Sequence, residues 1–126
     1  DRKIPAWTLG SNEGQAEINS RAARWVSYQG TAPHGQAACV AVFDHSDNPR
    51  HPALWQTRSQ YPYLNPSLTC QEDYVLRPGG TLRLRYGVLV SVGPADASAL
   101  EERWKAFART TAPPLRELDQ SASFEK

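Results

Sequence analysis

The residues best suited to chemistry lie close together between positions 44 and 52. Asp44 and His45 are adjacent, and Asp47 and His51 follow shortly after them. Imidazole and carboxylate groups bind divalent metals, and a histidine beside an aspartate suits acid–base catalysis near neutral pH. His45 and His51 are therefore the candidate catalytic residues.

A metal site is the weaker interpretation of the same residues. The His-x5-His spacing in a proline-rich segment matches no standard zinc motif. Turn capping by the aspartates, with the histidines bonded to backbone carbonyls, is favoured instead. No metal ligand set and no cofactor is predicted, although a divalent metal is left open.

A second group of side chains combines flat rings with planar polar groups. Sugar sites use this combination, because a ring stacks on the apolar face of a pyranose while amides and guanidinium groups bind its hydroxyls. The alternative is that the rings fill the core beneath a long loop. Their concentration in one stretch favours a ligand site formed by Asn48, Trp55, Arg58, Tyr61 and Asn65, with Tyr63 nearby. We expect one concave polar surface to gather His45, Asn48, His51, Trp55 and Arg58.

Composition and charge exclude several classes of protein. The 126 residues allow one domain. Fourteen Lys+Arg against 13 Asp+Glu give a net charge of +1, without the basic excess of a general nucleic-acid binder. No apolar run approaches the roughly 20 residues of a membrane span.

Nucleophile-elbow, P-loop and dinucleotide motifs are absent, so neither covalent catalysis nor a nucleotide cofactor is predicted. Cys39 and Cys70 permit one disulfide without requiring it.

The elements that must position these residues are mostly short strands. Residues 22–29 and 36–44 predict a hairpin whose second strand is buried on both faces. An extended piece over 53–58 and a short strand over 69–76 follow. Residues 81–92 alternate strictly and predict a strand in the sheet interior. Its core-facing residues are expected to be Leu82, Leu84, Tyr86, Val88 and Val90.

A single helix is predicted near the C-terminal end, over about residues 99–109. Ser98 and Glu101 form its candidate capping box. An apolar stripe is expected to face the sheet, made of Leu100, Trp104 and Phe107. Residues 1–112 are expected to form one β-rich domain, and residues 113–126 a polar tail.

Three stretches together resemble the C-terminal half of the bacterial PmoA family. They are AVFDHSDNPRHPALWQTR at 41–58, YPYLNP at 61–66 and LRLRYGVLVSVGPADASALEERWKAFA at 82–108. Members of that family commonly carry Asp-His-Pro-x-Asn-Pro-x-x-Pro-x-x-Trp-His-x-Arg after an aliphatic strand. A Leu-x-Leu-x-Tyr strand and a terminal helix follow. The resemblance covers roughly residues 11–108, including the earlier ARWVSYQG stretch.

Carried over residue by residue, the family motif falls on most of the candidate segment. The matching positions are Asp44, His45, Asn48, Pro49, His51, Pro52, Trp55, Arg58, Tyr61, Asn65 and Pro66. Three positions depart from it: Ser46 replaces the usual Pro, Gln56 the usual His and Pro62 the usual Gly. If the histidine replaced by Gln56 is catalytic or a ligand in relatives, the site is weakened here, which favours ligand binding over catalysis.

The resemblance implies an all-β antiparallel sandwich, similar to the galactose-mutarotase sandwiches, with one C-terminal helix. It implies that this chain is the C-terminal half, partnered by a missing N-terminal half of the same sandwich. A small-molecule ligand, a saccharide, is expected, with a periplasmic or secreted setting favoured over a cytoplasmic one. The alternative is a non-catalytic structural or interaction fragment. A metal-dependent oxygenase, implied by the family's name of methane oxygenase, is a distant third, because a methane-oxidising membrane subunit needs apolar spans.

Overall fold

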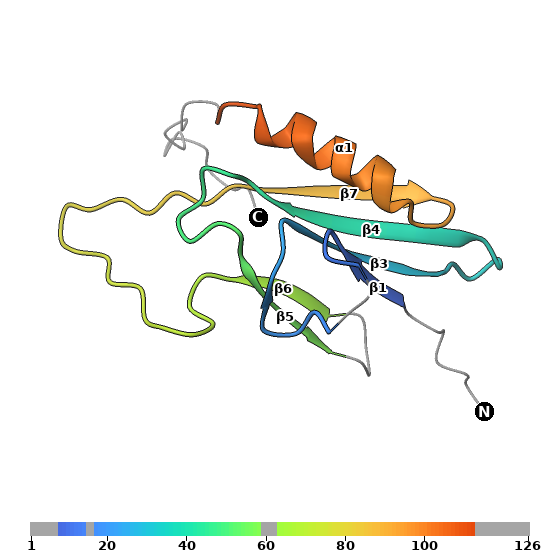
Figure 1. Ribbon diagram of the computed structural model, residues 1–126, viewed down its shortest axis with the longest axis horizontal. Coiled ribbons are helices and arrows are strands. Elements are labelled where there is room, and N and C mark those ends of the chain that lie inside the picture. Colours follow the sequence, from blue (N-terminus) through green and yellow to red (C-terminus); the bar gives the residue numbers. More distant parts are fainter. Residues whose placement is uncertain (1–7, 15–16, 59–62, 113–126) are drawn as a thin grey trace, which may run out of the picture.

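The computed structural model describes residues 8–14, 17–58 and 63–112, which form two antiparallel sheets and one helix (Figure 1). Sheet A has the strand order β1-β3-β4-β7, and sheet B has the order β2-β5-β6. The predicted fold class, an all-β antiparallel sandwich with one C-terminal helix, is confirmed. The elements are β1 (Thr8–Ser11), β2 (Arg21–Ala22), β3 (Trp25–Thr31), β4 (Ala37–Asp44), β5 (Leu54–Arg58), β6 (Tyr63–Ser67), β7 (Tyr86–Val92) and α1 (Ala97–Ala108).

The hairpin predicted over residues 22–29 and 36–44 is confirmed as β3 and β4. The two strands pair antiparallel, with Val26 opposite Val42. Gly35 permits the turn between them, because its φ of 83° lies in the left-handed region. The strand β4 is central in sheet A but is not buried on both faces as predicted, since Val40 is 39% exposed.

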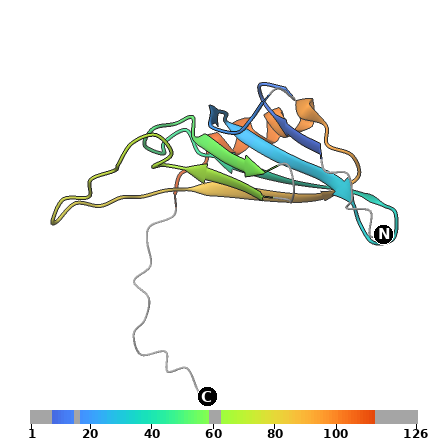
Figure 2. The same ribbon diagram turned by 90° about the horizontal axis from the view of Figure 1, so that it is seen from below.

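Alternating side chains divide the core into two thin layers. Successive residues of a strand point to opposite faces, so Trp25 faces α1 and Val26 faces sheet B. The helix-side cluster consists of Trp25, Cys39, Ala41, Phe43 and Leu100. The inter-sheet cluster consists of Ile18, Ala23, Val26 and Trp55. The helix therefore lies on one face of sheet A and sheet B on the other (Figure 1 and Figure 2).

The helix α1 begins two residues before its predicted start, and its N-cap is Asp96. The Asp96 carboxylate accepts hydrogen bonds from two amides of the first turn, including that of Ser98 at 3.0 Å. It thereby satisfies donors that have no partner within the helix. The predicted capping box of Ser98 with Glu101 is wrong. The predicted apolar stripe is confirmed, because helix-side packing involves Leu100, Trp104 and Phe107.

The strand predicted over residues 81–92 is shorter than expected and faces the other way. It begins at Tyr86 as β7, an edge strand that pairs with β4 in the described part of the chain. Leu89 packs on the helix-side cluster, whereas Val88 is 68% exposed and Val90 is 70% exposed. The alternation is present, but α1 covers the face opposite to the predicted one.

Two further positions of the predicted strand behave differently. Leu82 and Leu84 precede β7 in unpaired chain, and Leu84 is 38% exposed. Gly87 lies at a close approach between β7 and α1. A Cβ atom at this position would lie 3.2 Å from the ring of Phe107.

The segment between β6 and β7 projects beyond both sheets (Figure 1 and Figure 2). The prediction of a strand over residues 69–76 is wrong, because these residues form turns and unpaired chain. Cys39 and Cys70 are free thiols. No helix in the described ranges has the length and apolar character that crossing a membrane requires. The predicted polar tail, residues 113–126, lies outside the described residues.

Candidate functional site

The structure separates the predicted site residues instead of gathering them. Residues 45–52 fold under the end of β4, whereas β5 directs Trp55 into the core and ends at the exposed Arg58. The expectation of one shared concave surface is therefore wrong. Tyr61 lies outside the described residues.

Asp44 is the centre of the polar cluster at the end of β4. It is 1% exposed. Its Oδ1 accepts a hydrogen bond from Asn48 Nδ2 at 2.7 Å, and its Oδ2 accepts bonds from His51 Nδ1 at 2.6 Å and Ala53 N at 2.8 Å. Burying a carboxylate is costly unless such donors replace its hydration. The carboxylate thus fixes the course of residues 45–53.

His51 is oriented by Asp44 and by the helix. Its ring stacks on that of Trp104, with centroids 5.9 Å apart and 4° between the planes. Trp104 Nε1 in turn donates to the carbonyl of Asp44 at 2.8 Å. Nδ1 donates to the carboxylate, so in the neutral imidazole Nε2 carries the lone pair, and Nε2 has no hydrogen-bond partner within the described residues. An imidazole held in this way is able to accept a proton.

His45 is a structural residue here and not the catalytic group predicted. It is 1% exposed, and both ring nitrogens are engaged. Nδ1 accepts from the amide of Asp47 at 3.0 Å, so Nε2 carries the proton that it donates to the carbonyl of Thr110 at 2.9 Å. Its ring also meets that of Phe107 edge to face at 5.1 Å. The histidine therefore joins the end of β4 to the end of α1.

Asn48 is likewise used within the protein. It is 6% exposed. Its Oδ1 accepts from the amide of Arg85 at 2.7 Å, and its Nδ2 donates to the carbonyl of Arg85 at 2.7 Å as well as to Asp44. The side chain acts as a strand partner for Arg85 just before β7 begins. The predicted ligand-binding role is corrected, because no polar atom of this amide is left for a ligand.

Trp55 is a core residue and not the predicted stacking platform. It is 0% exposed and belongs to the inter-sheet cluster. Its Nε1 donates to the carbonyl of Ala23 at 2.8 Å. The pairing of β5 with β2 and β6 sets this orientation, because it directs alternate residues of β5 toward sheet A.

Arg58 and Asn65 lie on sheet B, and their ligand-binding roles stay predictions. Arg58 pairs with Tyr63 across β5 and β6, and its guanidinium lies 5.7 Å from the centre of that ring. Asn65 pairs with Gln56, to which its Nδ2 donates at 3.3 Å. The residue that replaces the family histidine, Gln56, therefore lies on this sheet and outside the Asp44 cluster.

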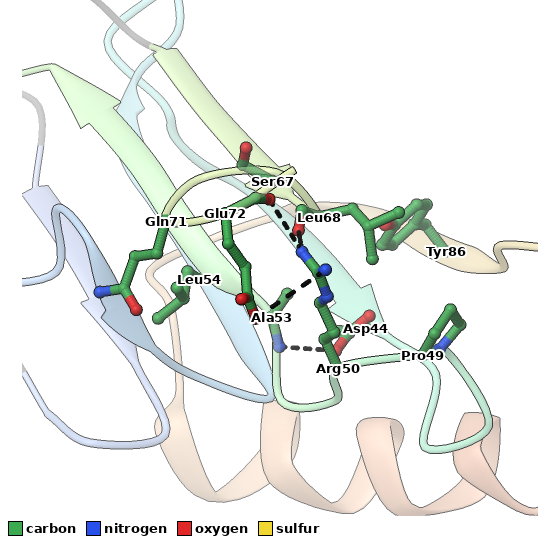
Figure 3. Close-up of a pocket in the computed structure, with 10 residues that line it drawn as sticks. All are labelled: Asp44, Pro49, Arg50, Ala53, Leu54, Ser67, Leu68, Gln71, Glu72 and Tyr86. Atoms are coloured by element: carbon green, nitrogen blue, oxygen red, sulfur yellow. Dashed lines mark hydrogen bonds and ion pairs between the residues drawn. The ribbon is translucent and has the colours of Figure 1, made fainter. Parts of the chain in front are cut away.

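A pocket of about 170 Å³ opens beside Asp44, where β4 and β6 end and β5 and β7 begin (Figure 3). Its polar lining residues are Asp44, Arg50, Ser67, Gln71, Glu72 and Tyr86. The rest of the lining is apolar. Burial raises the pKa of the Tyr86 hydroxyl, and the negative charge of Asp44 raises it further. The Tyr86 hydroxyl consequently stays protonated and able to donate.

Three uncharged polar groups of this pocket have no hydrogen-bond partner in the part of the chain that the structure describes. They are the Tyr86 hydroxyl, the Ser67 hydroxyl and the Gln71 amide. The sequence did not point to these groups, because Tyr86 is distant in the chain from Ser67 and Gln71 and fitted the core-facing pattern of a strand. No local signal identifies them.

Arg50 holds one wall of the pocket together. Its Nη1 donates to the carbonyls of Leu68 at 2.7 Å and Glu72 at 3.0 Å, and its Nη2 donates to that of Asp73 at 2.9 Å. Its guanidinium also lies 5.2 Å from the ring centre of Tyr74. The backbone of Arg50 has a φ of 62°, which is costly for a residue other than glycine. The hydrogen bonds of the Arg50 side chain fix residues 68–74. Their free energy offsets the cost of the Arg50 backbone conformation.

A second polar cluster fastens the helix to β3. Glu101 accepts from Arg24 Nη2 at 2.6 Å and from Trp25 Nε1 at 2.7 Å. Burial acts to raise the pKa of Glu101, but these bonds and the charges of Arg24 and Lys105 outweigh it and leave the pKa below its usual value. Its carboxylate is therefore ionised near neutral pH and serves as an anchor.

Within residues 8–14, 17–58 and 63–112, no three His, Cys, Asp or Glu side chains lie close enough to hold one metal ion. The fold and site thus define a β-sandwich protein with a small polar pocket at the strand ends. The chain belongs to DUF6807, a family of unknown function whose model matches residues 5–105. No curated protein and no solved structure matches the chain. The resemblance to the PmoA family stays a prediction.

Proposed function

We propose that the chain binds a small neutral saccharide in the pocket beside Asp44. One observation carries the proposal. The Tyr86 hydroxyl, the Ser67 hydroxyl and the Gln71 amide line the same small pocket, and none has a hydrogen-bond partner within the described residues. Unpaired donors and acceptors in a concave site are suited to a ligand that supplies complementary groups.

The charges around the pocket favour a neutral ligand. Asp44 already accepts three hydrogen bonds, and Arg50 already donates three. Glu72 Oε1 lies 3.9 Å from Arg50 Nη2. Asp44 is thus held by His51 and two further donors of the protein, and Arg50 is held by backbone carbonyls and faces Glu72, so the charged groups of the lining are already engaged within the protein.

The remaining lining suits a saccharide in particular. Leu54, Leu68 and Pro49 give the pocket apolar walls. A sugar ring presents C–H groups to such walls and hydroxyls to amide and hydroxyl partners. A volume of about 170 Å³ is below the roughly 300–1,000 Å³ of drug-sized pockets, so the ligand is a monosaccharide or one terminal unit. A saccharide is also the ligand class that the predicted resemblance to the PmoA family implies.

Binding is favoured over catalysis by the position of His51. It stacks on Trp104 of α1 and is not among the residues that line the pocket. The Asp44 carboxylate, which does line the pocket, already accepts three hydrogen bonds from the protein. The proposal therefore assigns the pocket a binding role.

The test is an NMR titration of the 126-residue chain with glucose, galactose, mannose and xylose. At least one sugar is expected to cause saturable shifts of amides in residues 67–72 and at Tyr86. Tyr86→Phe removes the hydroxyl alone and is expected to raise Kd about two- to tenfold, as loss of one hydrogen bond does. Tyr74→Phe is the matched control, because it removes a hydroxyl outside the pocket lining.

Two outcomes would contradict the proposal. Absence of saturable shifts with all four sugars would exclude the ligand class. If Tyr86→Phe and Tyr74→Phe weakened sugar binding equally, the pocket beside Asp44 would be excluded as the binding site.

A further inference from the structure

A second pocket, of about 110 Å³, lies between β1, β3 and the start of α1. The register places Gly10 opposite Ser27 across β1 and β3, on the face that Trp25 presents to the helix. Ala95 and Leu100 line the pocket from the side of α1. Its described lining residues are all different from those of the pocket beside Asp44.

Ser27 brings an unpaired hydroxyl to this second pocket. Ser27 is 2% exposed, and its Oγ has no hydrogen-bond partner in residues 8–14, 17–58 and 63–112. A buried polar group without a partner is uncommon and destabilises the fold unless a ligand or water completes it. Position 10 keeps the space beside this hydroxyl open, because a Cβ atom at Gly10 would lie 3.3 Å from Ser27 Oγ.

Gln29 brings a second donor to the pocket. Its Oε1 accepts from the amide of Ala95 at 2.9 Å, which fixes the orientation of the side-chain amide. Nε2 is the free end of the amide and has no hydrogen-bond partner within the described part of the chain. Because Ser27 Oγ and Gln29 Nε2 can both donate, the pocket is suited to a ligand with an acceptor oxygen.

The charges around the pocket favour a neutral acceptor. Among the described residues that line the pocket, none has a charged side chain. Asp96 lies in the chain between the lining residues Ala95 and Ala97, and its carboxylate already accepts from the amides of Ser98 and Ala99. An anion in the pocket would lose its hydration without meeting a cation and would lie near this carboxylate.

The apolar part of the lining limits the size and character of the ligand. Trp25 Nε1 is already bonded to Glu101 at 2.7 Å, so the indole and the Leu100 side chain offer apolar surface. The volume of about 110 Å³ exceeds the roughly 30 Å³ that one water takes up and is below the roughly 150 Å³ of a cavity that holds benzene. The pocket therefore has room for a group smaller than benzene.

We propose that this second pocket binds a neutral acetamido group, either as a free small amide or carried by a sugar. Its carbonyl oxygen accepts from Ser27 Oγ and Gln29 Nε2, and its methyl group lies against Trp25 and Leu100. The acetamido group combines a neutral acceptor and a methyl group within the size that the pocket allows. The proposal concerns a separate site and does not depend on the saccharide proposed beside Asp44.

The test is an NMR titration of the 126-residue chain with N-methylacetamide. Saturable shifts are expected for the amides of Ser27, Gln29 and Ala95, with a millimolar Kd because so small a ligand makes few contacts. Acetate has the same methyl group but a charged head, and it is expected to bind at least about tenfold more weakly. N-acetylglucosamine carries the group on a sugar: tighter binding than N-methylacetamide at the same amides would assign the group to a sugar, and weaker binding would assign it to a free amide.

Two variants test the location. Ser27→Ala removes the hydroxyl and is expected to raise the Kd about two- to tenfold, and Gly10→Ala fills the space beside it and is expected to raise the Kd about tenfold or more. Ser91→Ala is the matched control, because the register from Gln29 through Cys39 places Ser91 on the same face of sheet A, outside the pocket lining. Without ligand, Ser27→Ala is expected to keep or raise the Tm, since an unpaired buried hydroxyl forms no stabilising bond.

Four outcomes would overturn the proposal. Absence of saturable shifts with both N-methylacetamide and N-acetylglucosamine would exclude the ligand, and acetate binding as tight as that of N-methylacetamide would exclude the neutral class. An unchanged Kd in both Ser27→Ala and Gly10→Ala would exclude the pocket. A Tm lowered by Ser27→Ala would assign its hydroxyl a structural role.

Discussion

The two halves of the inner face of sheet A, which is the face toward sheet B, contrast sharply, although they are built from the same kind of residue. Val26 on β3 is 0% exposed beneath Trp55, whereas Val88 on β7, in the same cross-strand row, is 68% exposed. Side-chain type and alternation are equal in the two strands. The burial of a strand residue is thus decided by the extent of the opposing layer.

The largest expected change in the free energy of unfolding comes from the half of sheet A that sheet B covers. Trp55→Ala should lower the free energy of unfolding by about 3–5 kcal/mol, because it leaves a large cavity in the inter-sheet cluster and an unpaired carbonyl at Ala23. Urea denaturation followed by circular dichroism measures this loss. A loss below about 1 kcal/mol would show that sheet B contributes little to the core.

A matched pair of substitutions tests the contrast itself. Val26→Ala should cost about 2 kcal/mol, since two buried methyl groups are removed, while Val88→Ala should cost less than about 0.5 kcal/mol. Both are measured by urea denaturation at concentrations where the chain is monomeric. Similar losses at the two sites would mean that the β7 half is covered after all.

A smaller loss of stability than at Trp55 or Val26 is expected on the helix side, where Glu101 fastens α1 to β3. The pKa of Glu101 is lowered in the folded chain, so its ionised form stabilises the fold above the usual value of 4.5 and this contribution is lost as the pH falls through the folded value. Glu101→Gln should cost about 1 kcal/mol at pH 7, for a side chain that is 23% exposed. The difference from the native chain should shrink at acid pH.

Glu102→Gln serves as the control for that experiment. The Glu102 side chain is 73% exposed and pairs with Lys105. Its substitution should change stability little at any pH. A pH-independent cost of Glu101→Gln would contradict the assigned role of its charge.

The local parts of the fold were predictable from the sequence. The hairpin of β3 and β4 and the stripe on α1 follow from periodicity within a single segment. The face on which Val88 and Val90 lie was not predictable in the same way, because alternation gives two equivalent faces. The helix covers the face of Gly87 and Leu89, where Phe107 packs closely.

The candidate site was predictable only in part. The sequence identified residues 44–52 as a polar cluster, and Asp44 with His51 does form one. It did not reveal that Trp55 points inward, because the pairing of β5 with β2 and β6 sets that orientation. Nor did it reveal the pocket, because Ser67 and Gln71, at the end of β6 and in the turn after it, are far in the sequence from Tyr86 at the start of β7.

The carbonyl of Thr110 has a consequence for motion. It accepts from His45 Nε2 at 2.9 Å and from Arg85 Nη1 at 3.0 Å, so the end of α1 is tied to the end of β4 and to the chain before β7. A helix terminus normally frays on its own. Here fraying has to break bonds to two other segments, which makes the last turn of the helix part of the same cooperative opening unit as the sheet.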